Sequence, residues 1–202
     1  MAINSYSTLV TAVGNWLNRS DLTANIPDFI RLGEARIYRD LRINAMLASF
    51  SGTIAAGVIA VPSDFLEFKR VHVVTDPITP LTVVSPDYVM QNWPNRSSDG
   101  IPRAIARDGS NFIFGPYPDS TYAVAGSYYQ RMTLLLSASS NWFTSNAPDL
   151  LLYASLVEAE PFIMNDERVI LWEGKYQQAK MSVEKEDRRA SNRGGNRSMT
   201  AS

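Results

Sequence analysis

The chain has 202 residues, 45% of them hydrophobic, and its 19 basic side chains nearly balance its 20 acidic ones. This length suits one domain, or one core with a smaller lobe, and the even balance excludes a global basic field that would gather nucleic acid. The absence of cysteine excludes disulfides, zinc sites with thiolate ligands and cysteine nucleophiles.

The N-terminal residues lack the basic and apolar segments of a secretory signal. No stretch reaches the roughly 18 apolar residues that a membrane helix needs. We therefore expect a soluble protein that is made in the cytosol.

Apolar residues at spacings of three and four predict two helices before residue 45. Ser5 or Ser7 is placed to cap the first helix, and the polar residues 18–21 end it. The second helix is predicted over residues 26–43, with Pro27 in its first turn, where a missing N–H has no cost. Gly33 lies on the apolar stripe of this helix, which predicts close approach by another helix.

From about residue 48 to residue 132, helical spacing gives way to short β-type runs broken by Gly, Pro, Asn and Asp. The Asp108-Gly109 dipeptide predicts a hairpin turn between two of these runs, and residues 86–90 predict a short helix inside the lobe. The predicted strands cover residues 48–54, 58–61, 67–74, 81–83, 103–107, 111–115 and 123–130.

The last third of the chain is predicted to be helical again. Residues 150–157 are strongly apolar, Pro161 is expected to kink or break the helix, and Asn165-Asp166 resembles a cap for the next one. Apolar residues then alternate at spacings of three and four, which is the narrow seam of a coiled coil, suited to packing along another helix. The seam consists of Val169, Trp172, Tyr176, Ala179 and Val183.

This order of elements predicts an α+β fold, in which N- and C-terminal helices form a helical bundle with an inserted antiparallel β-lobe and an extended C-terminal tail. We assign residues 1–47 and 147–190 to the bundle, 48–146 to the β-rich lobe and 191–202 to the tail. Residues 188–202 carry four arginines and no acid. We expect this end to be disordered alone and to be held in place by a neighbour.

Few residues are available for enzyme chemistry. His72 is the single histidine, and its place in the alternating segment 71–74 indicates a strand residue rather than a catalytic base. One histidine without cysteine argues against a metal site, and no glycine motif for phosphate or dinucleotide binding is present. We therefore expect no catalytic, metal or cofactor site.

Acidic residues leave one enzymatic alternative open, because paired carboxylates can hydrolyse glycosidic bonds. Glu158 and Glu160 lie two residues apart and so point to different faces of a helix. The acids near residue 185 sit in a charge run typical of a solvated face. The full set of candidates is Glu34, Asp40, Glu158, Glu160, Glu184, Glu186 and Asp187.

The candidates for a surface that faces DNA phosphates are the arginine-rich C-terminal end and the arginines of the second predicted helix, Arg31, Arg36, Arg39 and Arg42. Arg36, Arg39 and Arg42 follow one another at intervals of three residues. A salt-bridged helix face that uses Glu34 and Asp40 is the alternative, and we favour it. No zinc-finger or RNA-recognition motif accompanies these arginines. A helix-turn-helix formed by the first two helices is conceivable, but the link between them is generic.

Several stretches together resemble one family, the phage head-to-tail adaptor proteins that sit beneath the portal ring, including the tail tubular protein A type. Near the N-terminus these are YSTLVTAVGNWLNR at residues 6–19 and IPDFIRLGEARIYRDLR at residues 26–42. In the lobe they are GIPR at residues 100–103 and GPYP at residues 115–118, followed by Tyr128-Tyr129. In the last third the match is LWEGKYQQAKMSVEKEDRR at residues 171–189. The order and spacing of these pieces carry the resemblance.

The resemblance implies a structural virion protein that is assembled in the host cytoplasm and is not an enzyme. Such adaptors form a ring of about twelve identical subunits that docks under the portal, extends the channel for double-stranded DNA without reading its sequence, and carries the tail nozzle and the fibres or spikes. The alternatives are a cell-wall or capsule hydrolase associated with the tail and a DNA-binding protein for packaging.

The resemblance also implies that the C-terminal segment inserts against the portal. The expected residues for binding the portal or a neighbour are Arg188, Arg189, Arg193, Arg197, Met199, Trp172 and Tyr176. The possible channel-facing basic residues are Arg36, Arg39 and Arg42.

Overall fold

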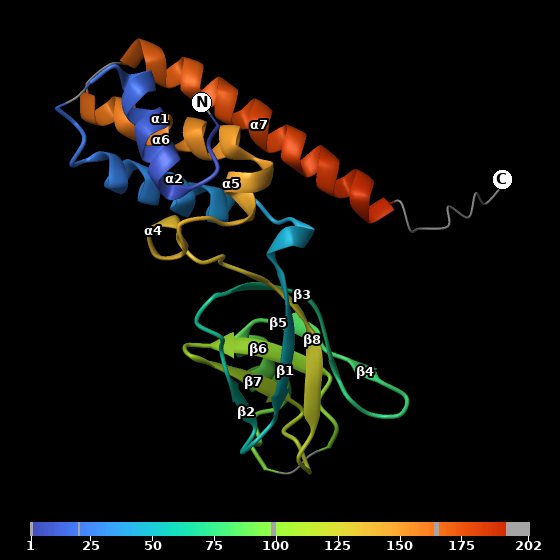
Figure 1. The fold of residues 1–202 in the computed structure, drawn as a ribbon. Coiled ribbons are helices and arrows are strands. Elements are labelled where there is room, and N and C mark those ends of the chain that lie inside the picture. Colours follow the sequence, from blue (N-terminus) through green and yellow to red (C-terminus); the bar gives the residue numbers. More distant parts are fainter. Residues whose placement is uncertain (1, 20, 98–99, 164–165, 193–202) are drawn as a thin grey trace, which may run out of the picture. The chain divides into compact units, whose positions relative to one another are not determined.

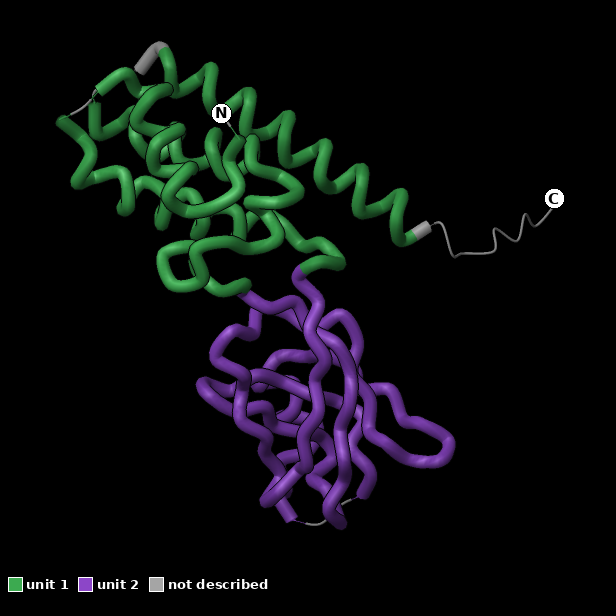
Figure 2. The backbone as a smooth tube through the Cα atoms, in the orientation of Figure 1, with its two compact units in different colours: residues 1–45, 132–202 green, residues 46–131 purple. Residues whose placement is uncertain are grey.

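The computed structural model describes residues 2–19, 21–97, 100–163 and 166–192, and it confirms the α+β class with helices at both ends of the chain. The chain forms two compact units (Figures 1 and 2). A helical unit contains Met1–Ala45 and Met132–Ser202, and a β-lobe contains Met46–Arg131. The β-lobe is therefore an insertion between two helical segments.

In the helical unit, α6 (Pro148–Ile163) is the central element. Its leucines and alanines are buried on every side, and α1, α2, α5 and α7 all pack against it. The surrounding helices are α1 (Tyr6–Leu17), α2 (Ile26–Asp40), α4 (Leu135–Ala138), α5 (Trp142–Asn146) and α7 (Asp166–Asn192). Residues 132–146, predicted as part of the lobe, belong to this unit. Their two helices, α4 and α5, are too short to show a helical period in the sequence.

Local signals at the N-terminal helices act as predicted. Ser5 caps α1, accepting a hydrogen bond from the Thr8 amide in a capping box. Pro27 occupies the first turn of α2. Helix α2 ends at Asp40 and not at residue 43, because the backbone becomes extended at Leu41, with φ −123° and ψ 137°. Leu41 and Ile43 are buried along this extended segment, so their spacing is that of a strand.

The C-terminal ends of α6 and α7 differ from the sequence expectation. Pro161 lies in the last turn of α6, which continues to Ile163, because so near the helix end the ring removes one hydrogen bond without breaking the packing. Helix α7 extends to Asn192, so Arg188 and Arg189 are helical and are not part of a disordered segment. The predicted cap at Asn165 and the segment 193–202 lie outside the described residues.

The β-lobe contains two four-stranded sheets, with strand orders β1-β8-β3-β4 and β2-β7-β6-β5. All seven predicted strands are confirmed, and the Asp108-Gly109 turn joins β6 to β7, with Gly109 at φ +59°. The elements are η1 (Asn44–Met46), β1 (Leu47–Thr53), β2 (Val58–Ala60), β3 (Phe65–Val73), β4 (Thr79–Pro80), β5 (Thr82–Val84), α3 (Pro86–Asn92), β6 (Ala104–Asp108), β7 (Asn111–Gly115) and β8 (Ala123–Gln130).

One strand pair departs from the antiparallel expectation. Strands β5 and β6 run parallel, with Val83 opposite Ile105. The chain passes through α3 between them, and a crossover of this kind returns the second strand in the same direction as the first. The lobe is therefore mixed and not purely antiparallel.

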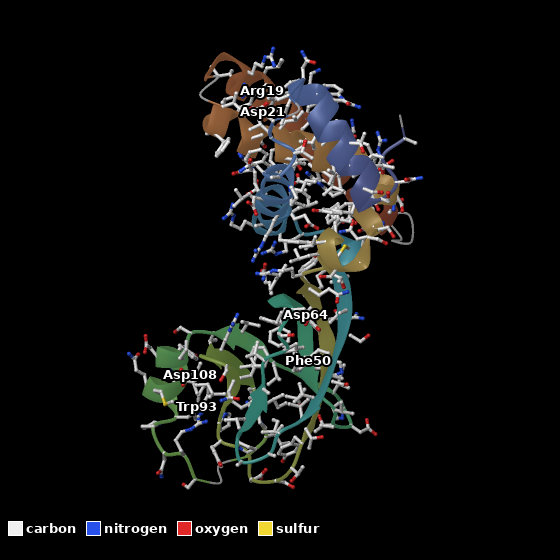
Figure 3. All side chains as sticks on the ribbon, turned by 60° about the vertical axis from the view of Figure 1, so that its left-hand side comes forward. Arg19, Asp21, Phe50, Asp64, Trp93 and Asp108 are labelled. Atoms are coloured by element: carbon white, nitrogen blue, oxygen red, sulfur yellow. The ribbon has the colours of Figure 1, made fainter. Side chains whose placement is uncertain are left out.

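Aromatic side chains fill the space between the two sheets. Phe50, which Figure 3 labels inside the lobe, lies 5.2 Å from Phe68 and 5.7 Å from Phe112, measured between ring centroids. Edge-to-face pairs of this kind stabilise a core beyond the area that they bury. His72 lies on β3, opposite Pro80 and Ala125, and so is a strand residue as predicted.

Candidate assembly interface

The predicted seam of α7 packs on the chain's own helical unit. Tyr176, Ala179 and Val183 are buried, and α7 lies along α6. The prediction that the seam packs along another helix is therefore confirmed, but that helix, α6, belongs to the same chain. The buried part of the seam cannot serve as a contact for a neighbouring protein.

Tyr176 is an internal anchor and not an exposed docking residue, which corrects its predicted role. Its side chain is fully buried, and its hydroxyl donates a hydrogen bond of 2.9 Å to Asp40 Oδ2. The Arg36 guanidinium lies 4.9 Å from the centre of its ring. Burial and the bond to Asp40 raise the pKa of the Tyr176 phenol well above its ordinary value.

Trp172 is half-buried in an aromatic cluster. Its ring stacks on Tyr153 at an interplanar angle of 16° and meets the edge of Trp16 at 5.5 Å between centroids. Its indole N–H donates to Glu160 Oε1 at 2.9 Å. Trp16 is the more exposed member of the cluster, at 47%, so the accessible aromatic surface here belongs to α1.

Arg36 links α2 to α6 and α7 through ion pairs, so its charge is compensated within the helical unit. Its Nη2 lies 2.6 Å from Glu173 on α7, and its Nη1 lies 3.3 Å from Glu158 on α6. Its Nε lies 4.0 Å from Asp40, four residues later on α2. The salt-bridged interpretation of this helix face is therefore correct for Arg36 and Asp40.

The other two predicted channel-facing arginines lie in different environments. Arg42 donates from Nη1 to the carbonyl oxygens of Tyr38 at 2.7 Å and Leu41 at 2.8 Å, which satisfies the end of α2. Arg39 is exposed. The interval of three residues thus does not bring Arg36, Arg39 and Arg42 to one free surface.

Glu34 is buried inside the helical unit. Its Oε1 accepts a hydrogen bond of 3.1 Å from the Leu135 amide at the start of α4. Burial raises the pKa of the Glu34 carboxyl to about 7, and the bond from Leu135 opposes this shift only in part. Compared with the unfolded chain, the folded protein therefore favours the protonated form of Glu34.

The raised pKa of Glu34 predicts a pH-dependent loss of stability. The folded-state pKa exceeds the unfolded value, so the favourable contribution is fully present below about pH 4.5 and is lost as the pH rises through 7. The substitution Glu34→Gln keeps a side-chain oxygen for Leu135 and stays neutral. We expect this variant to be more stable than the parent at pH 8, by up to about 3 kcal/mol.

The measurement is urea unfolding of both proteins at pH 5 and pH 8. The gain from Glu34→Gln should be small at pH 5 and large at pH 8, and the comparison cancels all groups that the two proteins share. A gain that is equal at the two pH values would contradict a buried, titrating Glu34.

The acids considered for hydrolysis have structural contacts. Glu158 pairs with Arg36, Glu160 is buried against Trp172, and Glu34 binds the start of α4. Asp187 accepts two bonds from the Asn44 side chain, at 3.0 and 3.1 Å, and one from its backbone N–H at 2.8 Å. Within the described part of the chain, no group of three or more acids or histidines could hold a metal ion.

A face of α7 that the sequence analysis missed points away from the seam. Ile170 is 79% exposed, Leu171 52% and Met181 61%. A Cβ atom added at Gly174 would meet nothing within 4 Å. At 100° per residue these positions lie about 120–180° from the centre of the seam, so a helical projection of residues 170–181 could have found them.

The exposed C-terminal end of α7 holds the remaining predicted residues that the structure describes. Arg188 pairs with Glu184 at 3.5 Å, and its side chain is 74% exposed. Arg189 is exposed as well. Arg193, Arg197 and Met199 lie outside the described residues.

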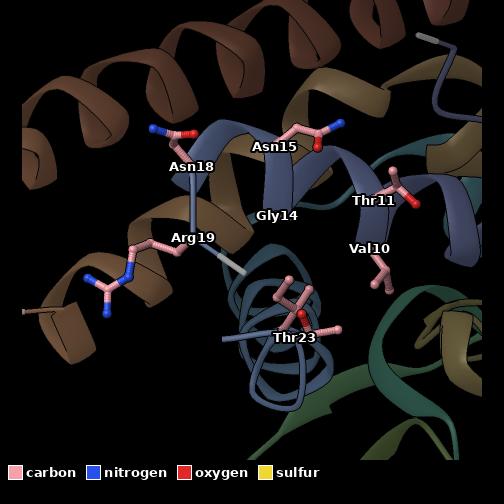
Figure 4. A pocket seen from close by; sticks show the side chains of 8 residues that line it. Val10, Thr11, Gly14, Asn15, Asn18, Arg19 and Thr23 are labelled. Atoms are coloured by element: carbon pink, nitrogen blue, oxygen red, sulfur yellow. The ribbon is translucent and has the colours of Figure 1, made fainter. Parts of the chain in front are cut away.

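A pocket of about 480 Å³ lies between α1 and α2 (Figure 4). Its lining includes Thr11, Gly14, Asn18 and Arg19. The Arg19 guanidinium is held by Asp21 through two hydrogen bonds of 2.7 and 2.6 Å. The positive charge at the pocket is therefore already paired with a carboxylate.

A comparison with known protein families places the chain in one of them. The family model described as SU10 adaptor protein matches residues 4–198, which is nearly the whole chain. A comparison with curated proteins gave no match. Over the residues that the structure covers, no helix is long and apolar enough to cross a membrane.

Proposed function

Since the chain belongs to the SU10 adaptor protein family of phage head-to-tail adaptors, and is thus a structural protein of the virion's tail connector, we propose that it forms a ring docked beneath the portal. The ring has about twelve identical subunits. It extends the DNA channel and carries the nozzle and the fibres or spikes.

The observation that carries the docking proposal is the length of α7. This helix has 27 residues against 16 in α6, so at 1.5 Å per residue it is about 16 Å longer. Its C-terminal end extends past the other helices of the unit (Figure 1). Arg188 and Arg189 are exposed on this end, and residues 193–202 continue from it with two more arginines.

Contact with DNA in the channel is proposed to be electrostatic and independent of sequence. The exposed basic residues Arg31 and Arg39 on α2 support it, whereas Arg36 and Arg42 are held by other residues of the helical unit. Phosphates are bound by such side chains without base recognition. We do not propose hydrolysis, because Glu34, Glu158 and Glu160 stabilise the helical unit.

Removal of residues 193–202 is expected to weaken portal docking strongly while leaving the fold intact. The cut follows Asn192, so Asp187 and Ser191 keep their bonds to Asn44. We expect an unchanged circular dichroism spectrum and binding to portal rings weakened at least about 100-fold, as for loss of several interface anchors. Sedimentation with purified portal rings measures the binding.

A matched pair of charge reversals tests the end of α7 itself. Arg188→Glu with Arg189→Glu should weaken portal binding, whereas Arg168→Glu with Lys175→Glu, the same charge change on exposed positions in the first half of the same helix, should not. Equal portal binding by the truncated and full chains would refute docking through this end.

A further inference from the structure

The hairpin between β3 and β4 carries an exposed aliphatic pair. Val73 pairs with Thr79, so Val74 and Ile78 are the next residues outward, and residues opposite each other in an antiparallel pair have Cβ atoms about 5 Å apart. Val74 is 52% exposed and Ile78 60%. The two side chains form one apolar surface on a hairpin that extends away from the lobe (Figure 1).

Hydrogen bonds hold the tip of this hairpin. The Thr75 hydroxyl donates to the Pro77 carbonyl oxygen at 2.8 Å, and its oxygen lies 3.0 Å from Thr79 Oγ1. A tip that is already ordered loses little conformational freedom on binding. Asp76 is exposed at the same tip and places a negative charge beside the aliphatic pair.

The same lobe has an apolar groove of about 230 Å³ between the first half of β3 and the strands β5 and β6. It lies where β3 twice shifts register against β8, between Phe65 and Glu67 and between Phe68 and Arg70. Such irregularities bend a strand away from regular pairing. The walls of the groove include Phe65, Phe68, Val83, Ile105 and Phe112.

The size and lining of the groove suit protein side chains. Its volume is below the roughly 300–1,000 Å³ of small-molecule sites, and its walls are mainly hydrocarbon. Glu67 and Arg107 also line it, both exposed, and the Arg107 guanidinium lies 5.9 Å from the centre of the Phe65 ring. The Arg107 side of the groove therefore matches an aliphatic tip that carries a nearby negative charge.

The hairpin does not reach the groove of its own lobe. It follows the last residue of β3, whereas Phe65 is the first residue of that nine-residue strand. At about 3.3 Å per residue the two ends of β3 are about 26 Å apart. A groove of this kind that receives the hairpin must therefore belong to another molecule.

We propose that the Val74–Ile78 pair of one copy binds in the apolar groove of a second copy, with Asp76 facing Arg107. This inference rests on the proposed ring assembly and gives that ring a contact between subunits. Because the two surfaces differ, the contact is head-to-tail, and its repetition closes into a ring if the rotation between subunits allows.

Cysteine cross-linking of the full chain tests the contact, because the chain has no native cysteine. An Asp76→Cys chain is mixed with an Arg107→Cys chain under oxidising conditions. We expect a disulfide-linked heterodimer to form at least about tenfold faster than in a control mixture that replaces Asp76→Cys with Asp87→Cys, an exposed acid on α3. Adding Ile78→Ser to the first chain should slow the reaction about tenfold.

Cross-linking no faster than in the Asp87→Cys control, or unaffected by Ile78→Ser, overturns the proposal. Ile78 is exposed, so its substitution leaves the core intact. A chain that binds portal rings without this cross-link refutes the hairpin–groove contact alone. A chain that forms the cross-link and does not bind portal rings refutes the proposed docking and leaves the contact standing.

Discussion

Gly33→Val is expected to destabilise the helical unit by about 3 kcal/mol, because it forces α2 away from α6. A Cβ atom at residue 33 would lie 2.9 Å from the Ser155 backbone nitrogen and 3.0 Å from the Ala154 carbonyl carbon. These are backbone atoms of the central helix, so no side-chain rotation can make room. Urea unfolding followed by circular dichroism measures the loss.

Gly174→Val is the matched control for this prediction. It makes the same substitution in a helix of the same unit, at a site where an added Cβ meets nothing within 4 Å. Its effect should stay within about 0.5 kcal/mol, since exposed positions tolerate such changes. Equal stabilities of the two variants would show that α2 and α6 do not meet closely at Gly33.

Tyr176→Ala is expected to cost about 4 kcal/mol and to loosen α7. Removal of a fully buried aromatic ring leaves a cavity, and it deprives Arg36 and Asp40 of a common partner. The free energy of unfolding and the rate of proteolysis within α7 are the measurements. Both should change together, because Tyr176 holds α7 to the rest of the unit.

Tyr176→Phe separates the ring from its hydroxyl. It keeps the packing and removes only the hydrogen bond to Asp40, so we expect a cost of about 1 kcal/mol. If the alanine variant were no less stable than the phenylalanine variant, the ring would not be the anchor of α7.

Local signals predicted most of the fold. Alternating apolar residues and turn dipeptides predicted the strands. Gly33 on the apolar stripe predicted the close contact of α2 with another helix, which is α6. The parallel pairing of β5 with β6 could not be predicted, since a two-residue period indicates a strand without naming its neighbour. The end of α2 was set too late because Leu41 follows Ile37 by four residues and so continues the helical spacing, although its backbone is extended.

The candidate interface was less predictable because it depends on distant partners. Arg36 meets Glu158 and Glu173, more than a hundred residues away in the chain, whereas its local spacing indicates only the contact with Asp40. The same holds for the seam of α7. Its period correctly predicted packing along a helix, but a period is identical whether the partner belongs to the same chain or to another.

The pairing of β1 with β8 has a consequence for folding. Leu47 lies opposite Tyr129, so once the lobe is folded the two chain ends that leave it are neighbours. The helices before and after the lobe are then joined by an effective loop of only a few residues. The unfolded insertion, residues 46–131, is longer than this loop by about four doublings. At about 0.6 kcal/mol for each doubling, a folded lobe lowers the entropic cost of closing the helical unit by about 2.4 kcal/mol, and so favours an order in which the inserted segment folds first.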